Sequence, residues 1–297
     1  MQQKITPNVW FDGTAKEAVE FYTSVFTNSA VISTAYYPRE GLPDFQRGFE
    51  GKELSIDFEL NGYRFTAINA GPEFSVNASI SFMVNFDPSR DDMAERHLVE
   101  LWSQLVEGGE VLMSLDTYPY SKRYGWVKDR YGVTWQLMLT DPAGEPRPFI
   151  IPALLFTGPN TNRAEEAMLY YQSIFRGTKQ GVISRYPEPT GPAEKGSIMF
   201  ADFMLEGQWF AVMDSGVDQN VQFSEAVSLS IACKDQAEID AYWEELSTVP
   251  EAEQCGWCKD KFGVSWQVVP ENIEELMSKP DAYTKLLNMK KLVIADF

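Results

Sequence analysis

The sequence predicts an α+β protein made of two tandem copies of one domain, each copy consisting of paired βαβββ modules, followed by a C-terminal helical tail. An internal repeat is the first observation: GWVKDRYGVTWQ at 125–136 returns as GWCKDKFGVSWQ at 256–267 with eight of twelve positions identical. The second is that strand-like and helix-like periodicities follow the same order in both copies. The third is the Pro/Gly-rich segment TDPAGEPRP at 140–148 between them. We therefore expect domains at 1–140 and 149–270 and a helical tail at 271–297.

Composition limits the classes of partner and of compartment. The 297 residues are 44% apolar and 23% charged, as in globular proteins, and they suffice for about two domains. Lys and Arg total 25 against 43 Asp and Glu, a net charge of −18. Such a surface repels phosphate backbones and anionic lipids, so we expect neither nucleic acid nor membrane as a partner. Three cysteines form no disulfide framework, and we expect a cytoplasmic protein.

The first module of each copy begins with a short apolar strand, residues 5–11 in copy one. Thr14 and Glu17 form a capping box that predicts a helix start, and Asn162 with Glu165 takes this role in copy two. Three strand-like segments follow the helix. Asn61-Gly62 joins the last two of them, which is a strong hairpin signal. One apolar stripe runs along the helix: Ala18, Phe21, Tyr22, Val25 and Phe26.

The second module begins with a strand at 79–86 and continues with another amphipathic helix. It closes with short strands that end in a hairpin at 129–132, or at 260–263 in copy two. After Pro270 the tail is expected to form a helix, a break at Pro280 and a second helix through Leu287. The second helix carries these apolar residues in copy one and copy two: Leu98, Leu101, Trp102 and Leu105; Ile239, Tyr242, Trp243 and Leu246.

Strand alternation indicates which residues face away from the helices. A repeated βαβββ pattern is expected to place helices on one face of each sheet and to leave the other face concave. In the last strand of copy one, Trp135 and its apolar neighbours two residues apart face the helices, so Gln136 faces the concavity. Gln267 holds the same position in copy two.

Four segments resemble a known family, the PhnB-like branch of the vicinal oxygen chelate superfamily, often labelled 3-demethylubiquinone-9 3-methyltransferase. They are WFDGTAKEAVEFYTSVF at 10–26, FELNGYRFTAINAG at 58–71, CGWCKDKFGVSWQVVP at 255–270 and the tail at 272–297. The superfamily also includes glyoxalases, bleomycin-resistance proteins and extradiol dioxygenases. The resemblance implies paired βαβββ modules around a cleft, and in the superfamily's enzymes a divalent metal held by His and Glu.

Neither a metal nor a cofactor is expected in this chain. A methyltransferase normally carries a Gly-rich loop between a parallel strand and a helix, and no such loop is present. His97 is the only histidine and falls in a helix rather than on a strand. Gln136 and Gln267 stand at the position that resembles the family's Glu ligand, and a neutral amide is a poor ligand. The first strands supply no better metal ligands, because their sequences there are Thr-Pro-Asn at 6–8 and Ile-Pro-Ala at 151–153.

The candidate site residues are polar or aromatic and recur in both copies. Paired carboxylates in a cleft are able to perform acid–base chemistry or bind a hard cation, and a tryptophan wall suits a flat ligand. The alternative is that the carboxylates lie on solvated strands and the tryptophans pack under the terminal hairpins. Cys255 and Cys258 have redox spacing but lie at a strand entry, so we expect them to stay reduced. The candidate ligand-binding residues are Asp57, Asn69, Trp126, Gln136, Asp202, Asp214, Trp257 and Gln267.

The function predicted from these residues is binding of a small molecule that is flat or positively charged. The alternative is a metal-assisted isomerase, lyase or dioxygenase, and a third reading is a structural pseudo-dimer whose clefts have lost function. We expect the two halves to pack as a pseudo-two-fold pair that imitates a dimer of single-copy relatives; a homodimer of the whole chain stays open.

Overall fold

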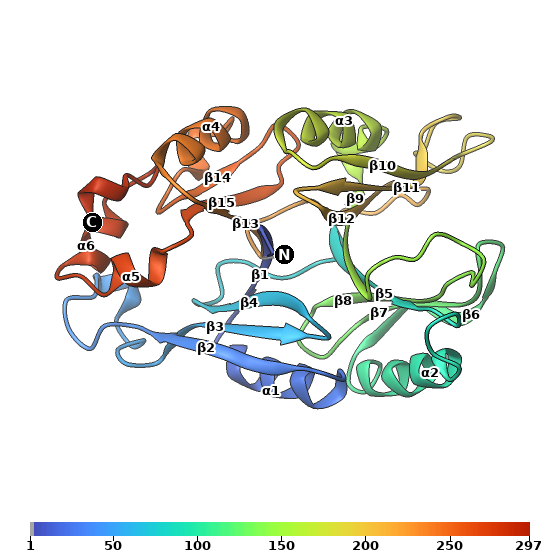
Figure 1. Cartoon of the computed structure of the whole chain (residues 1–297), viewed down its shortest axis with the longest axis horizontal. Helices are drawn as coiled ribbons and strands as arrows, with labels where there is room; N and C mark the ends of the chain where they lie inside the picture. The colour runs from blue at the N-terminus through green and yellow to red at the C-terminus, as the bar shows by residue number, and fades with distance from the viewer. Residues whose placement is uncertain (1–2) are drawn as a thin grey trace.

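The computed structural model describes residues 3–297 and contains two mixed β-sheets with helices on their outer faces (Figure 1). The first half comprises β1 (Ile5–Phe11), α1 (Ala15–Val25), β2 (Ala30–Tyr36), β3 (Glu53–Leu60), β4 (Tyr63–Asn69), β5 (Ile80–Phe86), α2 (Ala94–Leu105), β6 (Glu110–Tyr118), β7 (Ser121–Lys128) and β8 (Thr134–Leu139). The second half comprises β9 (Ile150–Phe156), α3 (Ala164–Ile174), β10 (Lys179–Arg185), β11 (Ile198–Leu205), β12 (Gln208–Asp214), β13 (Val227–Cys233), α4 (Gln236–Leu246), β14 (Trp257–Lys259) and β15 (Ser265–Pro270). The tail forms α5 (Ile273–Met277) and α6 (Ala282–Leu287). The α+β class, the tandem modules and the helical tail are confirmed.

Each sheet combines one module from each half of the chain. Sheet A has the order β14-β15-β13-β1-β4-β3-β2, and sheet B has the order β10-β11-β12-β9-β5-β8-β7-β6. Antiparallel pairs join the halves, β1 with β13 in sheet A and β5 with β9 in sheet B. Helices α1 and α4 lie outside sheet A, and α2 and α3 lie outside sheet B (Figure 1). The two halves therefore share both sheets, as a pseudo-two-fold pair does.

The last module lacks one of the strands that the repeat predicts. The segment between α2 and β7 spans 106–120 and contains β6, whereas the segment between α4 and β14 spans only 247–256 and contains no strand. The tail occupies the free edge: the backbone N–H groups of Cys255 and Gly256 donate to the carbonyls of Met289 and Lys290, at 2.8 and 2.7 Å. A shorter segment and a tail that covers the edge explain why sheet A has seven strands and sheet B eight.

A buried aspartate closes the core of each half. Asp129 is 2% exposed and accepts hydrogen bonds from the Tyr22 hydroxyl (2.8 Å) and the Trp135 indole N–H (2.8 Å). The backbone N–H groups of Tyr131 and Val133 donate to its other oxygen. Burial raises the pKa of Asp129, and these four donors oppose the rise. The sequence predicts a hairpin at 129–132 but not this internal role of its aspartate. Asp260 repeats the arrangement with these partners: Tyr171, Phe262, Val264 and Trp266.

The predicted capping boxes are wrong in their hydrogen bonds, although α1 does begin directly after Thr14. The Thr14 side chain makes no capping bond. In the second half α3 begins at Ala164, and no side chain of the preceding residue caps it. Asp214 supplies the missing acceptor from the end of β12, because its Oδ1 lies 3.1 Å from the Ala164 backbone nitrogen. A carboxylate from a neighbouring strand thus replaces the predicted local cap of α3.

None of the helices in residues 3–297 combines the length and the apolar character needed to span a membrane.

Candidate functional site

Polar side chains gather on the inner face of sheet A, which we define as the face opposite the helices. Asp57 on β3 is partly exposed there and pairs in register with Thr66 on β4. Its carboxylate accepts hydrogen bonds from the Thr66 hydroxyl (2.6 Å) and the Ser33 hydroxyl (2.9 Å). No cation is among its hydrogen-bond partners within residues 3–297. The same face carries Thr6, Asn8, Ser228, Ser230 and Gln267.

Two tryptophans meet across this inner face. Trp257 on β14 and Trp10 on β1 have ring centroids 6.3 Å apart at an interplanar angle of 79°. Phe74 packs edge-on against Trp10 at 5.0 Å. The Trp10 indole N–H donates to the Gly71 carbonyl at 2.7 Å, which fixes the ring. Trp10 was missed as a site residue, although alternation along β1 from Asn8 would have placed it on this face.

The two predicted glutamines lie on inner faces, and their amides are already hydrogen-bonded. Gln267 on β15 donates to the Ser228 hydroxyl at 2.9 Å in sheet A. Gln136 on β8 repeats this in sheet B by donating to the Ser81 hydroxyl at 2.7 Å, and its carbonyl accepts from the Tyr124 hydroxyl at 2.7 Å. Alternation therefore placed both side chains correctly. Gln136, at 1% exposure, is closed off from solvent.

The inner face of sheet B is more apolar and more buried than that of sheet A. Asp202 on β11 occupies the position equivalent to Asp57, but it pairs with Arg147 from the segment between the halves, Nε to Oδ2 at 2.6 Å. Trp126 on β7 is half-buried, and its buried indole N–H has no hydrogen-bond partner among residues 3–297. The apolar residues of this face are Met83, Met138, Ile151, Ala153, Phe200, Met204, Trp209, Ala211 and Met213.

Asn69 and Asp214, two of the predicted ligand-binding residues, do not join either group, because both face the helices rather than a cleft. Alternation along β4 places Thr66 and Ile68 on the inner face, so Asn69 at the strand end faces the helices and is 6% exposed. Its side-chain amide donates to the Glu53 carbonyl at 3.1 Å. Asp214 also lies on the helix face, where it caps α3 and accepts from the Ile198 backbone N–H at 3.0 Å. Burial raises the pKa of Asp214.

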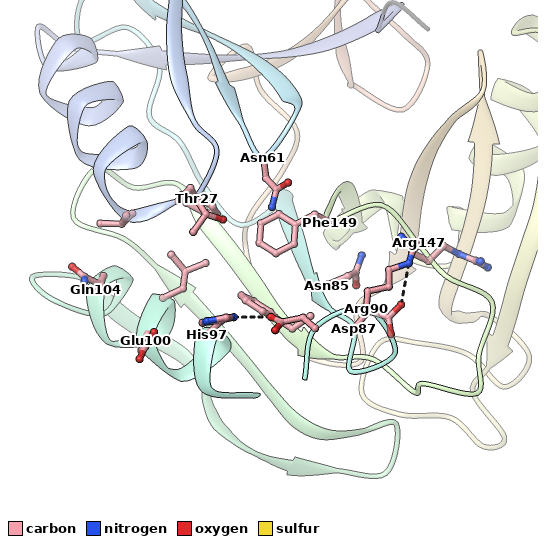
Figure 2. A pocket seen from close by; sticks show the side chains of 15 residues that line it. Thr27, Asn61, Asn85, Asp87, Arg90, His97, Glu100, Gln104, Arg147 and Phe149 are labelled. Atoms are coloured by element: carbon pink, nitrogen blue, oxygen red, sulfur yellow. Dashed lines mark hydrogen bonds and ion pairs between the residues drawn. The ribbon is translucent and has the colours of Figure 1, made fainter. Parts of the chain in front are cut away.

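A separate cavity of about 460 Å³ opens on the helix side, between the ends of α1 and α2 (Figure 2). His97 lies at its wall and pairs with Asp91, Nδ1 to Oδ2 at 2.6 Å. At the equivalent place in the other half stands Tyr242, whose hydroxyl donates to Glu206 at 2.9 Å. Leu101 holds the corresponding position in the first half and lines the cavity. His97 is an exposed residue of α2, and its predicted position in a helix is confirmed.

The residues present do not fit the divalent metal that the fold family implies. Within residues 3–297, no group of three or more His, Cys, Asp or Glu side chains is placed to hold a metal ion. The first strands present Asn8 and Ala153 to the inner faces, and the last strands present Gln267 and Gln136. A transition metal with useful affinity needs imidazole, thiolate or several carboxylates, and these faces offer mainly amides and hydroxyls.

The cysteines are free, and the Cys255-x-x-Cys258 pair is not positioned as a redox centre. Cys258 is 1% exposed on the helix face of β14, whereas Cys255 lies just before the strand with φ +53°. Burial raises the pKa of Cys233 to about 12 and raises those of Cys255 and Cys258 as well. Few thiolates are therefore present at neutral pH.

In native protein at pH 8, we expect iodoacetamide to label Cys255 before the other two cysteines. Cys233 and Cys258 should react more than roughly 100-fold more slowly in the native protein than in the unfolded protein, because the thiolate is the nucleophile and burial disfavours it. Mass spectrometry of labelled peptides with and without urea measures these rates.

Replacing Cys255 and Cys258 together by serine should cost only about 1–2 kcal/mol of stability. An intramolecular disulfide in protein purified without reductant would contradict this expectation.

Comparison with known proteins places this architecture among its relatives. The family profile described as 3-demethylubiquinone-9 3-methyltransferase matches residues 3–138 and again 148–269. A PhnB protein from Bacillus cereus, described with the same methyltransferase label, is 36% identical; the match covers 46% of this chain and 100% of that one, with a TM-score of 0.40. Glyoxalase I from Zea mays is 12% identical; the match covers 92% of this chain and 96% of that one, with a TM-score of 0.52, and shows the same fold. No curated protein matches the chain.

Proposed function

The chain belongs to the 3-demethylubiquinone-9 3-methyltransferase family, of vicinal oxygen chelate fold, and from that premise we propose that it binds a flat, positively charged small molecule on the inner face of sheet A. The observation that carries the proposal is the meeting of Trp10 and Trp257 on the face that also holds Asp57. Asp57 is partly exposed and is hydrogen-bonded only to hydroxyl groups within the described chain, so its charge is available to a cation.

The physical chemistry of this face favours a cation with an extended π-system. Cation–π contact with a tryptophan contributes about 0.5–2 kcal/mol, increasing as the cation is desolvated. A charged hydrogen bond to a carboxylate adds about 1.5–3 kcal/mol. The hydroxyls of Ser33 and Thr66 orient the Asp57 carboxylate before a ligand arrives, which lowers the cost of ordering the site.

The competing function is a metal-assisted isomerase, lyase or dioxygenase. Such an enzyme would need a metal with an open coordination position for a substrate oxygen. The inner faces present Gln136 and Gln267 where the family resemblance implies a carboxylate, and the side-chain oxygens of both are part of neutral amides. The donor set therefore favours binding over metal-assisted catalysis.

We expect proflavine, a flat cation, to bind saturably and to quench tryptophan fluorescence, while the flat neutral molecule acridone binds more weakly. Asp57→Asn should weaken proflavine binding about tenfold, the loss of one charged hydrogen bond, and leave acridone nearly unaffected. Trp257→Ala should weaken both ligands because the ring contacts either one. Trp126→Ala, which removes the equivalent ring from sheet B, is the matched control and should retain the wild-type affinity. Isothermal titration calorimetry measures both ligands with the wild type and the three variants independently of fluorescence.

Two results would contradict the proposal. One is the absence of saturable proflavine binding, or binding that Asp57→Asn and Trp257→Ala both leave unchanged. The other is elemental analysis of protein purified without chelator that finds about one Fe, Zn, Ni or Mn per half, which would favour the metal-assisted enzyme.

A further inference from the structure

Asp202 is the residue of sheet B that corresponds to Asp57, and its carboxylate already binds a flat cation, the guanidinium of Arg147. Its Nε donates to Asp202 Oδ2 at 2.6 Å, and its Nη2 lies 3.4 Å from Asp202 Oδ1. The guanidinium carbon lies 3.8 Å from the centroid of the Trp209 ring, a short cation–π contact. The side chains of Arg147 and Asp202 are only 10% and 6% exposed. The Asp202 carboxylate and the Trp209 ring thus bind one guanidinium and shield it from water.

The surroundings of Asp202 indicate a built recognition site rather than an incidental ion pair. The Val182 backbone N–H donates to Asp202 Oδ1 at 2.6 Å, and this fixes the carboxylate against β10. Gly181 lies opposite, where a Cβ would come within 2.0 Å of Asp202 Oδ1, so only glycine permits this approach. Two further charged groups lie nearby: Glu145, which pairs with Arg147, and Lys179, whose ammonium lies 5.5 Å from the Trp209 ring.

Arg147 reaches the site from the segment that connects the halves, between β8 and β9. It belongs to the Pro/Gly-rich segment 140–148, which contains no helix or strand. The occupant is therefore carried on a connecting segment, whereas the acceptors Asp202 and Trp209 lie on the rigid strands β11 and β12. Removal of one side chain would empty the site and leave its walls in place.

We propose that the inner face of sheet B is a binding site for an alkylguanidinium or similarly forked, flat cation, and that the chain's own Arg147 occupies it as an internal competitor. A tethered group competes at an effective concentration in the millimolar range, so an external guanidinium binds measurably only when Arg147 is removed or displaced. This site is distinct from the one on sheet A. It stands or fails independently of it, because Asp57 and Trp257 take no part.

Chemical rescue tests the proposal. Arg147→Ala should lower the melting temperature, and millimolar ethylguanidinium should raise it again by roughly 2–4 °C, as expected for a ligand that binds only the folded state. Ethylammonium, which carries the charge without the planar fork, should produce less than half of that rise. Wild-type protein and Arg147→Ala/Asp202→Asn should show no rise, because the site is occupied in the first and has lost its carboxylate in the second.

Arg185→Ala is the matched control. Arg185, on β10 of the same sheet, forms a two-pronged pair with Glu165 of α3, but these side chains are 41% and 43% exposed, so its removal should create no ethylguanidinium response. If Arg147→Ala does not fold, Arg147→Gln keeps the side-chain stem without the charge and should respond in the same way. Lys179→Gln in either background removes a cation that lies 5.5 Å from the Trp209 ring, close enough to move into the vacated place. The absence of an ethylguanidinium-specific rise in all these variants, or an equal rise in the Asp202→Asn double variant, would overturn the proposal.

Discussion

Replacing Asp260 by alanine is expected to lower the free energy of unfolding by about 3–5 kcal/mol. The substitution leaves four buried donors without an acceptor: the Tyr171 hydroxyl, the Trp266 indole and the backbone N–H groups of Phe262 and Val264. Asp260 is 0% exposed, so water does not reach these donors without local opening. Urea denaturation followed by circular dichroism measures the loss.

The repeat supplies a matched test of this prediction. Asp129→Ala removes the same four-donor acceptor from the first half and should cost a similar amount, because its partners and distances repeat those of Asp260. Asp57→Ala, which removes a partly exposed aspartate bonded to two hydroxyls, is the control and should cost less than about 1 kcal/mol. A loss below about 1 kcal/mol at Asp260 would show that the buried carboxylate is not a major source of stability.

Much of the fold could be predicted from the sequence because the repeated segments carry local signals. The Asn61-Gly62 turn, the alternation along β8 and the break at Pro280 each depend on neighbours within a few residues, and all three are confirmed. The pairing of modules across the two halves could not be predicted in this way. Both copies have strands of similar character, and only the tertiary structure selects β1 with β13 and β5 with β9.

The candidate site shows the same division. Inner-face positions inside regular strands, such as Asp57, Gln136 and Gln267, follow from alternation. Asn69 and Asp214 lie at strand ends, where the same alternation turns them toward the helices, and their polarity alone suggested the wrong face. Arg147 could not be predicted as the partner of Asp202, because it lies in an irregular segment whose path depends on the assembled sheets.

The shared sheets also determine what each half requires from the other. All seven residues of β5 and all seven of β9 are buried, and these two strands pair with each other. A separated half would expose the free edges of both of its modules, and an apolar, unpaired strand edge promotes association with any available strand. The two halves are therefore expected to depend on one another for stable folding.

The fragments 1–143 and 144–297 are each expected to self-associate or aggregate when they are expressed separately. When they are co-expressed, they should co-purify as a 1:1 complex whose unfolding midpoint lies within a few degrees of that of the intact chain. The cut falls between β8 and β9, so it breaks no strand pair and leaves Arg147 with Asp202 in the second fragment. Size-exclusion chromatography with light scattering measures the assembly state. Ile151→Asp in the second fragment places a charge on the inner face of β9 opposite Met83 and should reduce co-purification, whereas Val217→Asp, at a residue 68% exposed, should not. If both fragments were monodisperse monomers without mutual affinity, the pseudo-two-fold pair would not be an obligate assembly, and each half would have to fold with its modules paired in another way.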